Sequence, residues 1–189
     1  MLNHTSYRKF VSLGGDTRVM LRFLNWQDRE GILELFQEAS DEEVRLMKED
    51  FRDPDLTQHW LEGLDYHRVL PLVAVDMRVN RFVAGAILHK GKHTARHVGE
   101  VRIFVAPPVR NLGLGSLMLK ELLHLSVKEN LQWLKAEVIA AHKPVISAFR
   151  ARGFQVKAIL EDYFLRQDGR TQDVALMMRP VIKEEEAEF

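Results

Sequence analysis

The alternation of apolar and polar residues at the start of the chain predicts a β-hairpin followed by helices. Tyr7–Leu13 and Thr17–Phe23 are strand-like runs, and the glycine-rich residues 14–16 between them suit a tight turn. Asp28 then occupies a helix N-cap position ahead of apolar residues at helical spacing. In residues 40–68, a proline separates two short predicted helices. The apolar residues that mark the first helix and the last are Ile32, Leu35, Phe36 and Ala39, and then Leu56, Trp60 and Leu64.

From residue 71 onward, the pattern predicts strands interrupted by two helices. The clearest helix is Leu114–Asn130, where leucines recur on one face and polar residues form a row on another. A second helix, Pro144–Arg152, has proline in its first turn and Gly153 just after its end. The predicted strands are residues 72–75, 82–89, 98–105, 133–139, 154–160 and 173–179, with turns near Asn80 and at Asp168-Gly169.

This order of elements predicts an α/β (α+β) fold. We expect a mixed, mostly antiparallel sheet of about six to seven strands with helices on both faces. With 189 residues and no repeat or linker, the chain is expected to form one domain over residues 1–189. Residues 1–16 would be its N-terminal strand and turn, and the acidic residues 183–189 a frayed, solvated tail.

The composition argues against several classes of function. Lys+Arg and Asp+Glu both number 27, so the formal net charge is zero, which does not suit general nucleic-acid binding. The chain has no cysteine, which removes disulfide frameworks and thiol nucleophiles and fits a reducing compartment. It has no run of about 18 apolar residues and no signal-peptide pattern at its start. We therefore expect no membrane span and a cytoplasmic location.

The most informative segment is residues 105–116, which joins a strand to the clearest helix. Its two prolines cannot donate to a sheet ladder, so the strand must end there. Gly113 and Gly115 let the backbone come close to a ligand, and the unpaired N–H groups of a helix start suit a pyrophosphate. The lysine of a nucleoside-triphosphate loop and the third glycine of a dinucleotide fingerprint are both missing. The glycines alone also allow a turn that binds nothing.

The segment resembles the acetyl-CoA signature of the GNAT-type N-acetyltransferases, Val-x-Pro-x-x-Arg/Gln-x-x-Gly-x-Gly. The matching residues are Val105, Pro107, Arg110, Gly113 and Gly115, and the order of elements over residues 17–178 also resembles that family. The resemblance implies a GNAT fold that uses acetyl-CoA as co-substrate, in which strand 98–105 splays from its parallel neighbour 133–139 around the cofactor.

The same resemblance assigns the cofactor contacts. It implies that the pantetheine arm meets backbone groups of Ile103, Phe104 and Val105. It also implies that the pyrophosphate is held by Ser116 and by the amides of Arg110, Asn111, Leu112, Gly113, Leu114 and Gly115.

Glu100 is the candidate general base. Amide formation from a thioester needs a neutral amine, and an amine with a pKa of about 10.4 must lose a proton at neutral pH. Glu100 lies in mid-strand, where burial would raise the pKa of a carboxyl toward neutrality, and it matches the glutamate base of the protein-lysine branch of the family. The alternative is a rim carboxylate paired with Arg102 or another cation, and Glu137 on the next strand is a second candidate base.

The sequence departs from the family pattern in the helix after residue 139. His142 stands where the family has the asparagine that holds the cofactor, so His142 becomes the candidate for that contact. Phe149 stands where the family has a tyrosine that protonates the leaving sulfur. Because a thiol has a pKa of about 8.5, the thiolate can leave without that acid, so we expect a slower or differently assisted enzyme. Tyr163 is a possible substitute, although a tyrosine near a strand end more often packs.

The histidines suggest a metal site only weakly. His89, His93 and His97 surround one predicted hairpin, where His89 and His97 could pair across the strands. A metal site needs three or four converging ligands, so we expect no metal.

The acceptor is expected to be a primary amine. In the family, the segment between the first two helices walls the acceptor groove, and here residues 40–68 hold nine carboxylates and four basic residues. An acidic rim favours a cationic amine such as a protein lysine, a polyamine or an aminoglycoside, whereas a merely solvated helical surface is an equally good interpretation. Residues 65–71 and 96–102 most resemble GNAT domains of bacterial protein-lysine acetylation.

These observations together predict an N-acetyltransferase that works by direct attack of the amine in a ternary complex. No covalent enzyme intermediate is expected, because the chain has no cysteine and no evident activated serine. A non-catalytic acyl-CoA-binding sensor is the alternative function that Phe149 suggests. Whether the protein forms a homodimer is left open by the sequence.

Overall fold

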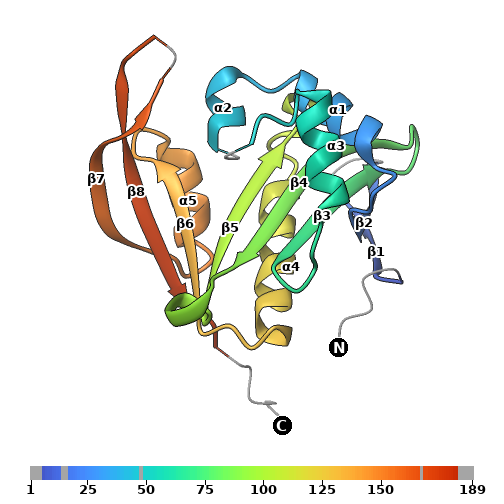
Figure 1. The fold of residues 1–189 in the computed structure, drawn as a ribbon. Helices are drawn as coiled ribbons and strands as arrows, with labels where there is room; N and C mark the ends of the chain where they lie inside the picture. Colours follow the sequence, from blue (N-terminus) through green and yellow to red (C-terminus); the bar gives the residue numbers. More distant parts are fainter. Residues whose placement is uncertain (1–5, 14–16, 47–48, 167, 183–189) are drawn as a thin grey trace, which may run out of the picture. The chain divides into compact units, whose positions relative to one another are not determined.

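The computed structural model describes residues 6–13, 17–46, 49–166 and 168–182 (Figure 1). The chain folds as two compact units. Unit 1 comprises residues 1–89 and 102–119, and unit 2 comprises residues 90–101 and 120–189. The predicted turn at 14–16 and the predicted acidic tail at 183–189 lie outside the described residues, and a single domain over the whole chain stays a prediction.

The described residues of unit 1 form three whole strands, all but the last residue of a fourth, and three α-helices. Strand β5 (Val98–Val105) ends in this unit, and helix α4 (Leu114–Lys128) begins in it after the 3-10 helix η2 (Pro107–Val109). The other elements of this unit are β1 (Arg8–Ser12), β2 (Arg18–Phe23), α1 (Arg29–Gln37), α2 (Asp41–Leu46), α3 (Pro54–Glu62), β3 (Val69–Asp76) and β4 (Arg81–Lys90), whose last residue belongs to unit 2.

Unit 2 contains the start of β5, the rest of α4 and the C-terminal elements. These are the 3-10 helix η1 (His93–Ala95), β6 (Trp133–Ile139), α5 (Lys143–Arg150), β7 (Gln155–Leu165) and β8 (Thr171–Pro180). The predicted limits of the strands at 98–105 and 133–139 are the observed ones.

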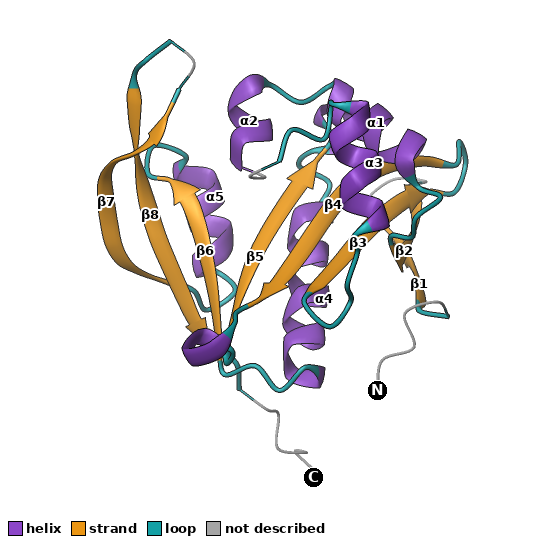
Figure 2. Cartoon of the chain, viewed as in Figure 1, coloured by secondary structure: helices purple, strands orange, loops and turns teal. Residues whose placement is uncertain are grey.

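Among the described residues, eight strands pair in the order β1-β2-β3-β4-β5-β6-β8-β7. The β1–β2, β2–β3, β3–β4, β6–β8 and β7–β8 pairs are antiparallel, whereas β5–β6 is parallel. The predicted mixed, mostly antiparallel α/β sheet is confirmed, with one or two strands more than expected (Figure 2).

Strand β3 forms the centre of the core of unit 1. It is buried at seven of its eight positions, which requires cover on both faces, because a strand with one solvated face would alternate. Helices α1 and α3 lie across this part of the sheet in Figure 1. Their apolar residues and those of the α2 region pack against β3, β4 and β5 in one cluster: Leu24, Ile32, Leu35, Phe36, Ala39, Val44, Phe51, Leu61, Val73, Val75, Ile87, Phe104 and Ala106.

The structure corrects the expected role of Asp28. This residue lies at the predicted N-cap of α1, but its side chain makes no capping hydrogen bond. Its carboxylate instead accepts two hydrogen bonds from the Arg22 guanidinium, at 2.6 and 2.7 Å, and one from the Asn25 amide at 2.8 Å. Because an arginine fork matches a carboxylate in two bonds, this pair outcompetes the helix N–H groups.

Candidate active site

In unit 1, the segment predicted to bind the cofactor runs from the end of β5 to the start of α4. Phe104 is 4% exposed, and its ring centroid lies 4.8 Å from that of Phe36 in α1. The two prolines of η2 follow, so β5 ends where the sequence predicts. The backbone groups expected to meet the pantetheine arm, those of Ile103, Phe104 and Val105, therefore come from a strand end fixed by aromatic packing.

The turn before α4 contains two residues in the left-handed conformation. Asn111 has φ +64° and Gly113 has φ +83°, a region that glycine adopts without strain. A Cβ atom added at Gly113 would meet no atom within 4 Å, whereas one added at Gly115 would lie 3.6 Å from Val105 Cγ2. The turn thus presents open space beside Gly113, where a ligand can approach the backbone.

The amides of this turn have the arrangement of an anion site. Val109 N donates to Ala106 O, and Arg110 N donates to Pro107 O. From Asn111 to Ser116, no amide donates to a backbone carbonyl in the described part of the chain, and Leu117 N makes the first helical bond, to Gly113 O. Six consecutive amides at the positive end of a 15-residue helix fit a pyrophosphate, so the residues present suit the implied co-substrate.

The Arg110 side chain turns to other protein groups. Its Nε donates to Val105 O at 2.9 Å, and its Nη2 donates to Glu43 Oε1 at 2.5 Å. The guanidinium carbon lies 5.9 Å from the centroid of the Phe104 ring. Sequence reasoning did not connect Glu43 with this turn, because 67 residues separate it from Arg110.

In unit 2, the candidate base lies in a cluster of three charged side chains. Lys135 Nζ contacts Glu100 Oε2 at 2.8 Å and Glu137 Oε1 at 3.0 Å. The Glu100 side chain is 14% exposed and that of Glu137 is 10% exposed. Lys135 was not predicted as a site residue. The register of the parallel pair explains the contact, because Glu100 lies directly opposite Lys135 and Glu137 is two residues farther along β6.

The cluster supplies the cation of the alternative interpretation. Glu100 was expected to be either a desolvated base or a carboxylate paired with Arg102 or another cation, and it forms an ion pair with Lys135, while its role as the base stays a prediction. Burial disfavours the Lys135 ammonium, but hydrogen bonds from it to Glu100 and then Glu137 outweigh burial and raise the pKa of Lys135 above its usual 10.5. The ammonium therefore holds the Glu100 and Glu137 carboxylates in place beside it.

The parallel ladder that carries this cluster is short. Pairs run from Val98↔Trp133 to Glu100↔Lys135 and stop there, although each strand continues for several residues.

Three other predicted positions of unit 2 lie in or beside α5 and β7. His142 is the N-cap residue of α5, three residues after the end of β6, and its side chain makes no capping bond. Phe149 is 8% exposed and packs edge-on against Phe154, with centroids 5.1 Å apart. Tyr163 is 53% exposed and its ring packs beside Phe164. The Phe149 ring is therefore part of the hydrophobic core. The role of Tyr163 as an acid stays a prediction.

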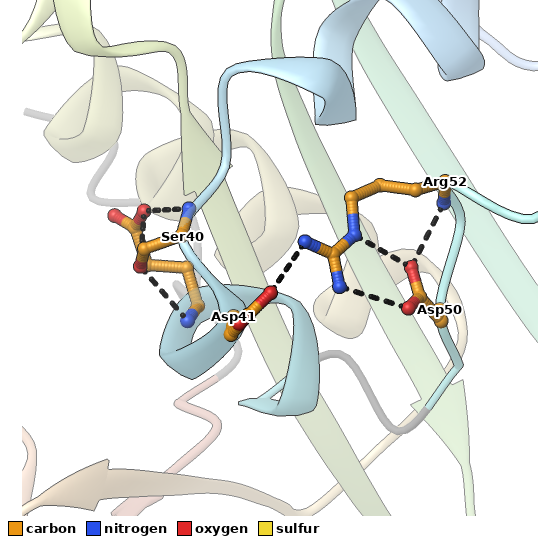
Figure 3. Close-up of polar contacts among 5 residues, drawn as sticks. Ser40, Asp41, Asp50 and Arg52 are labelled. Atoms are coloured by element: carbon orange, nitrogen blue, oxygen red, sulfur yellow. Dashed lines mark hydrogen bonds and ion pairs between the residues drawn. The ribbon is translucent and has the colours of Figure 1, made fainter. Parts of the chain in front are cut away.

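Several carboxylates of the acidic segment 40–68 are engaged in local structure. Arg52 donates to Asp41 at 2.7 Å and to Asp50 at 2.9 Å (Figure 3). These bonds link the start of α2 to the segment that precedes α3. The bond from Arg52 holds the pKa of Asp50 below its usual value. Asp53 caps α3 by accepting from two backbone amides. Less charge is thus available to an acceptor than the composition alone suggests.

An apolar hollow lies in unit 1 between α1, α3 and the sheet. Its lining carries no charged side chain, so it does not identify an ammonium-binding position. The lining consists of Leu24, Ile32, Leu35, Phe36, Phe51, Trp60, Leu72, Val73, Gly85, Ala86 and Ile87.

Among the described residues, no group of three or more histidine or carboxylate side chains is arranged to hold a metal ion. No helix formed by the described residues is long and apolar enough to cross a membrane.

Comparison with known proteins identifies a family and a fold. The model of the acetyltransferase (GNAT) family matches residues 29–154, well over half of the chain. A search of curated proteins found no matching relative.

Solved structures with a similar fold include three acetyltransferases. A ribosomal-protein-S5-alanine acetyltransferase from Vibrio fischeri is 14% identical and has a TM-score of 0.78, over 93% of this chain and 97% of that one. A phosphinothricin acetyltransferase from Sinorhizobium meliloti, in complex with acetyl-CoA, is 23% identical with a TM-score of 0.74, over 86% and 88%. A spermidine N-acetyltransferase chimera, from Vibrio cholerae and hSSAT, is 22% identical with a TM-score of 0.72, over 86% and 95%. At these identities the likeness concerns the fold, and the three acceptors differ.

Proposed function

The chain belongs to the acetyltransferase (GNAT) family, and we propose that it moves an acetyl group from acetyl-CoA to a primary amine by direct attack in a ternary complex. The observation that carries the proposal is the turn at Asn111–Ser116. Its amides lack carbonyl partners in the described chain, and the space beside Gly113 is open. In the similar structure from Sinorhizobium meliloti, acetyl-CoA is the bound ligand.

The turn would bind the donor through backbone groups. Its amides and the hydroxyl of Ser116 donate to the pyrophosphate, and the positive end of α4 adds to the attraction. Backbone groups of Ile103, Phe104 and Val105 hold the pantetheine arm, and His142, at the start of α5, is the second contact to the cofactor. The thioester supplies an activated acetyl carbon.

Glu100 would take the proton that the amine loses. The amine nitrogen forms a bond with the acetyl carbon, the carbon–sulfur bond breaks, and the thiolate leaves. Lys135 Nζ lies 2.8 Å from Glu100 Oε2 and would hold the carboxylate in place for this transfer. Phe149 offers no phenol, so solvent protonates the thiolate, whose ordinary pKa of about 8.5 makes it a tolerable leaving group.

The acceptor class that we test first is the protein lysine side chain, because the segment at 40–68 is acidic. Small cationic amines are also attracted by an acidic surface. The experiment must therefore distinguish protein lysines from small amines as acceptors.

The test is transfer of labelled acetyl from acetyl-CoA into a mixed bacterial extract, with proteins separated from small molecules. Wild type and Glu100→Gln are compared with Lys157→Gln, which removes an exposed charge of β7 that contacts only Gln155 within the described chain. Label on proteins that is lost in Glu100→Gln alone would support a protein acetyltransferase with Glu100 as base. Label only on small molecules would shift the acceptor to a metabolite or drug amine. Acetyl-CoA binding without any transfer would make a non-catalytic sensor the better account.

A further inference from the structure

Arg110 is the residue directly before the six amides of the cofactor turn, and its side chain is held at three points. Its Nε donates to Val105 O, its Nη2 donates to Glu43 Oε1, and its guanidinium lies over the Phe104 ring. The first and third contacts come from β5, close by in sequence. The contact with Glu43 is the only one of the three that comes from a distant segment.

The two carboxylate oxygens of Glu43 accept hydrogen bonds from different segments. Oε2 accepts from Ser40 N at 3.0 Å and from Ser40 Oγ at 2.9 Å, while Glu43 N donates to Ser40 Oγ at 3.3 Å. This is a capping box of the type Ser-x-x-Glu, and it forms the start of α2 (Figure 3). Oε1 is left for Arg110. One carboxylate thus links the start of α2 to the residue before the cofactor amides.

A second set of ion pairs also holds the start of α2. Arg52 joins Asp41, the first residue of α2, to Asp50 in the segment that follows. The neighbouring Phe51 ring packs on Phe36, with centroids 5.3 Å apart, and Phe36 packs in turn on Phe104. The α2 region is therefore connected to the end of β5 by an ion pair and by a row of aromatic rings.

We propose that Glu43 is a positioning residue for the donor site. It holds Arg110 and so fixes the backbone that presents the amides of Asn111–Ser116. Through the same bond, acetyl-CoA binding and the order of α2 are coupled, and the coupling must be reciprocal. The inference rests on the proposed function, because it needs acetyl-CoA to bind at this turn.

The central variant is Glu43→Gln. Glutamine can complete a capping box as glutamate does, so the start of α2 is preserved. The negative charge of the Glu43 carboxylate that faces the Arg110 guanidinium is lost. We expect an acetyl-CoA affinity about two- to fivefold weaker by calorimetry, since the Glu43 and Arg110 side chains are partly exposed, at 26% and 39%. Hydrogen exchange adds a second measurement. Acetyl-CoA should slow exchange at the α2 amides in wild type, and this slowing should disappear in Glu43→Gln.

Three controls separate positioning from general loss of structure. Ser40→Ala weakens the cap of α2 but keeps the charge of Glu43, so it should lower the acetyl-CoA affinity by less than Glu43→Gln does. Glu34→Gln removes an exposed ion pair of the same unit, with Arg81 at 3.3 Å, and should leave the affinity unchanged. In an Arg110→Gln background, Glu43→Gln should cause no further loss, because its effect acts through Arg110.

The outcomes are distinct. Wild-type affinity in Glu43→Gln, equal losses in Ser40→Ala and Glu43→Gln, or additive losses with Arg110→Gln would each overturn the inference and leave the proposed function standing. If wild type itself does not bind acetyl-CoA, the proposed function is wrong and the inference falls with it.

Discussion

Two glycines of this chain allow a direct test of the donor site. Gly113 in the cofactor turn has φ +83°, and Gly169 in the turn between β7 and β8 has φ +79°. A Cβ added at either position would meet no atom within 4 Å. Gly113→Ala and Gly169→Ala therefore impose the same backbone strain without a steric clash, and they differ only in where the new methyl group stands.

The cost to stability should be nearly equal for the two variants. An alanine held in the left-handed region costs about 1–2 kcal/mol. For a domain of this size, about 1 kcal/mol lowers Tm by about 2–4 °C, so each variant should melt a few degrees below wild type. A typical stability of about 5–15 kcal/mol leaves both folded.

The effect on binding should differ sharply. In Gly113→Ala, the methyl group stands beside the amides of Asn111–Ser116 and keeps the pyrophosphate from at least one of them. A hydrogen bond to a charged group contributes about 1.5–3 kcal/mol, so the acetyl-CoA affinity should fall by about tenfold or more. Gly169→Ala should bind as tightly as wild type. The bulkier, β-branched Gly113→Val should abolish binding.

The assay is calorimetric titration with acetyl-CoA, together with thermal unfolding in its presence and absence. Saturating ligand should raise the Tm of wild type and Gly169→Ala by equal amounts, and that of Gly113→Ala by less. If Gly113→Ala kept the full affinity, or if Gly169→Ala lost as much, the amide turn would not be the donor site.

The remaining predictions concern charges and a helix cap. Lys135→Met removes the ammonium 2.8 Å from Glu100, so the acid limb of the rate–pH profile should move to higher pH; an unmoved limb would argue against Glu100 as the base. The raised pKa of Lys135 contributes stability that is fully present below its unfolded value of about 10.5 and is lost as pH rises through the folded value. Denaturant unfolding from pH 9 to 11.5 should therefore show a smaller alkaline decline in Lys135→Met than in wild type. Asp53→Ala removes a cap that accepts from Asp55 N at 2.9 Å and Leu56 N at 3.1 Å, which should cost about 1 kcal/mol in unfolding free energy, whereas Asp53→Asn should restore most of it.

The parts of the fold that were predicted correctly have strong local signals. The prolines after Val105 stop β5 at the predicted residue, because they cannot donate to the ladder. The leucine-rich face of α4 predicts its start at Leu114. Its end was placed two residues too late, since Asn130 has φ +55° and cannot continue a helix.

The irregular strand β7 shows where a local pattern is insufficient. The prediction ended at Leu160, because the polar pair that follows looks like a loop. The strand instead continues to Leu165 across a register shift between Leu160 and Phe164, where Asp162 adopts φ +53°. The Asp162 amide donates to Asp173 on β8 at 3.1 Å. A partner on another strand holds this bulge together, and sequence periodicity does not reveal such a partner.

In the candidate site, too, features with local sequence signals were predicted and contacts between distant segments were not. The position of the turn and of Glu100 could be found from spacing and resemblance, but the partners of Arg110 and Glu100 could not. Lys135 contacts Glu100 because of the register of the parallel β5–β6 pair. Glu43 contacts Arg110 because α2 packs close to the turn before α4. Tertiary contacts of this kind are set by packing and not by local propensity.

The bridging position of Lys135 changes how substitutions at the base must be interpreted. Glu100→Gln leaves Lys135 paired with Glu137, and Glu137→Gln leaves it paired with Glu100, so in either variant the ammonium retains a carboxylate. A loss of rate confined to Glu100→Gln would then reflect the missing proton acceptor and not a disordered lysine. Equal losses in both variants and in Lys135→Met would mean that the three side chains act as one unit, because removing any member of a coupled cluster disables the whole. The comparison between the two glutamates therefore decides whether Glu100 alone, or the cluster that Lys135 holds together, accepts the proton.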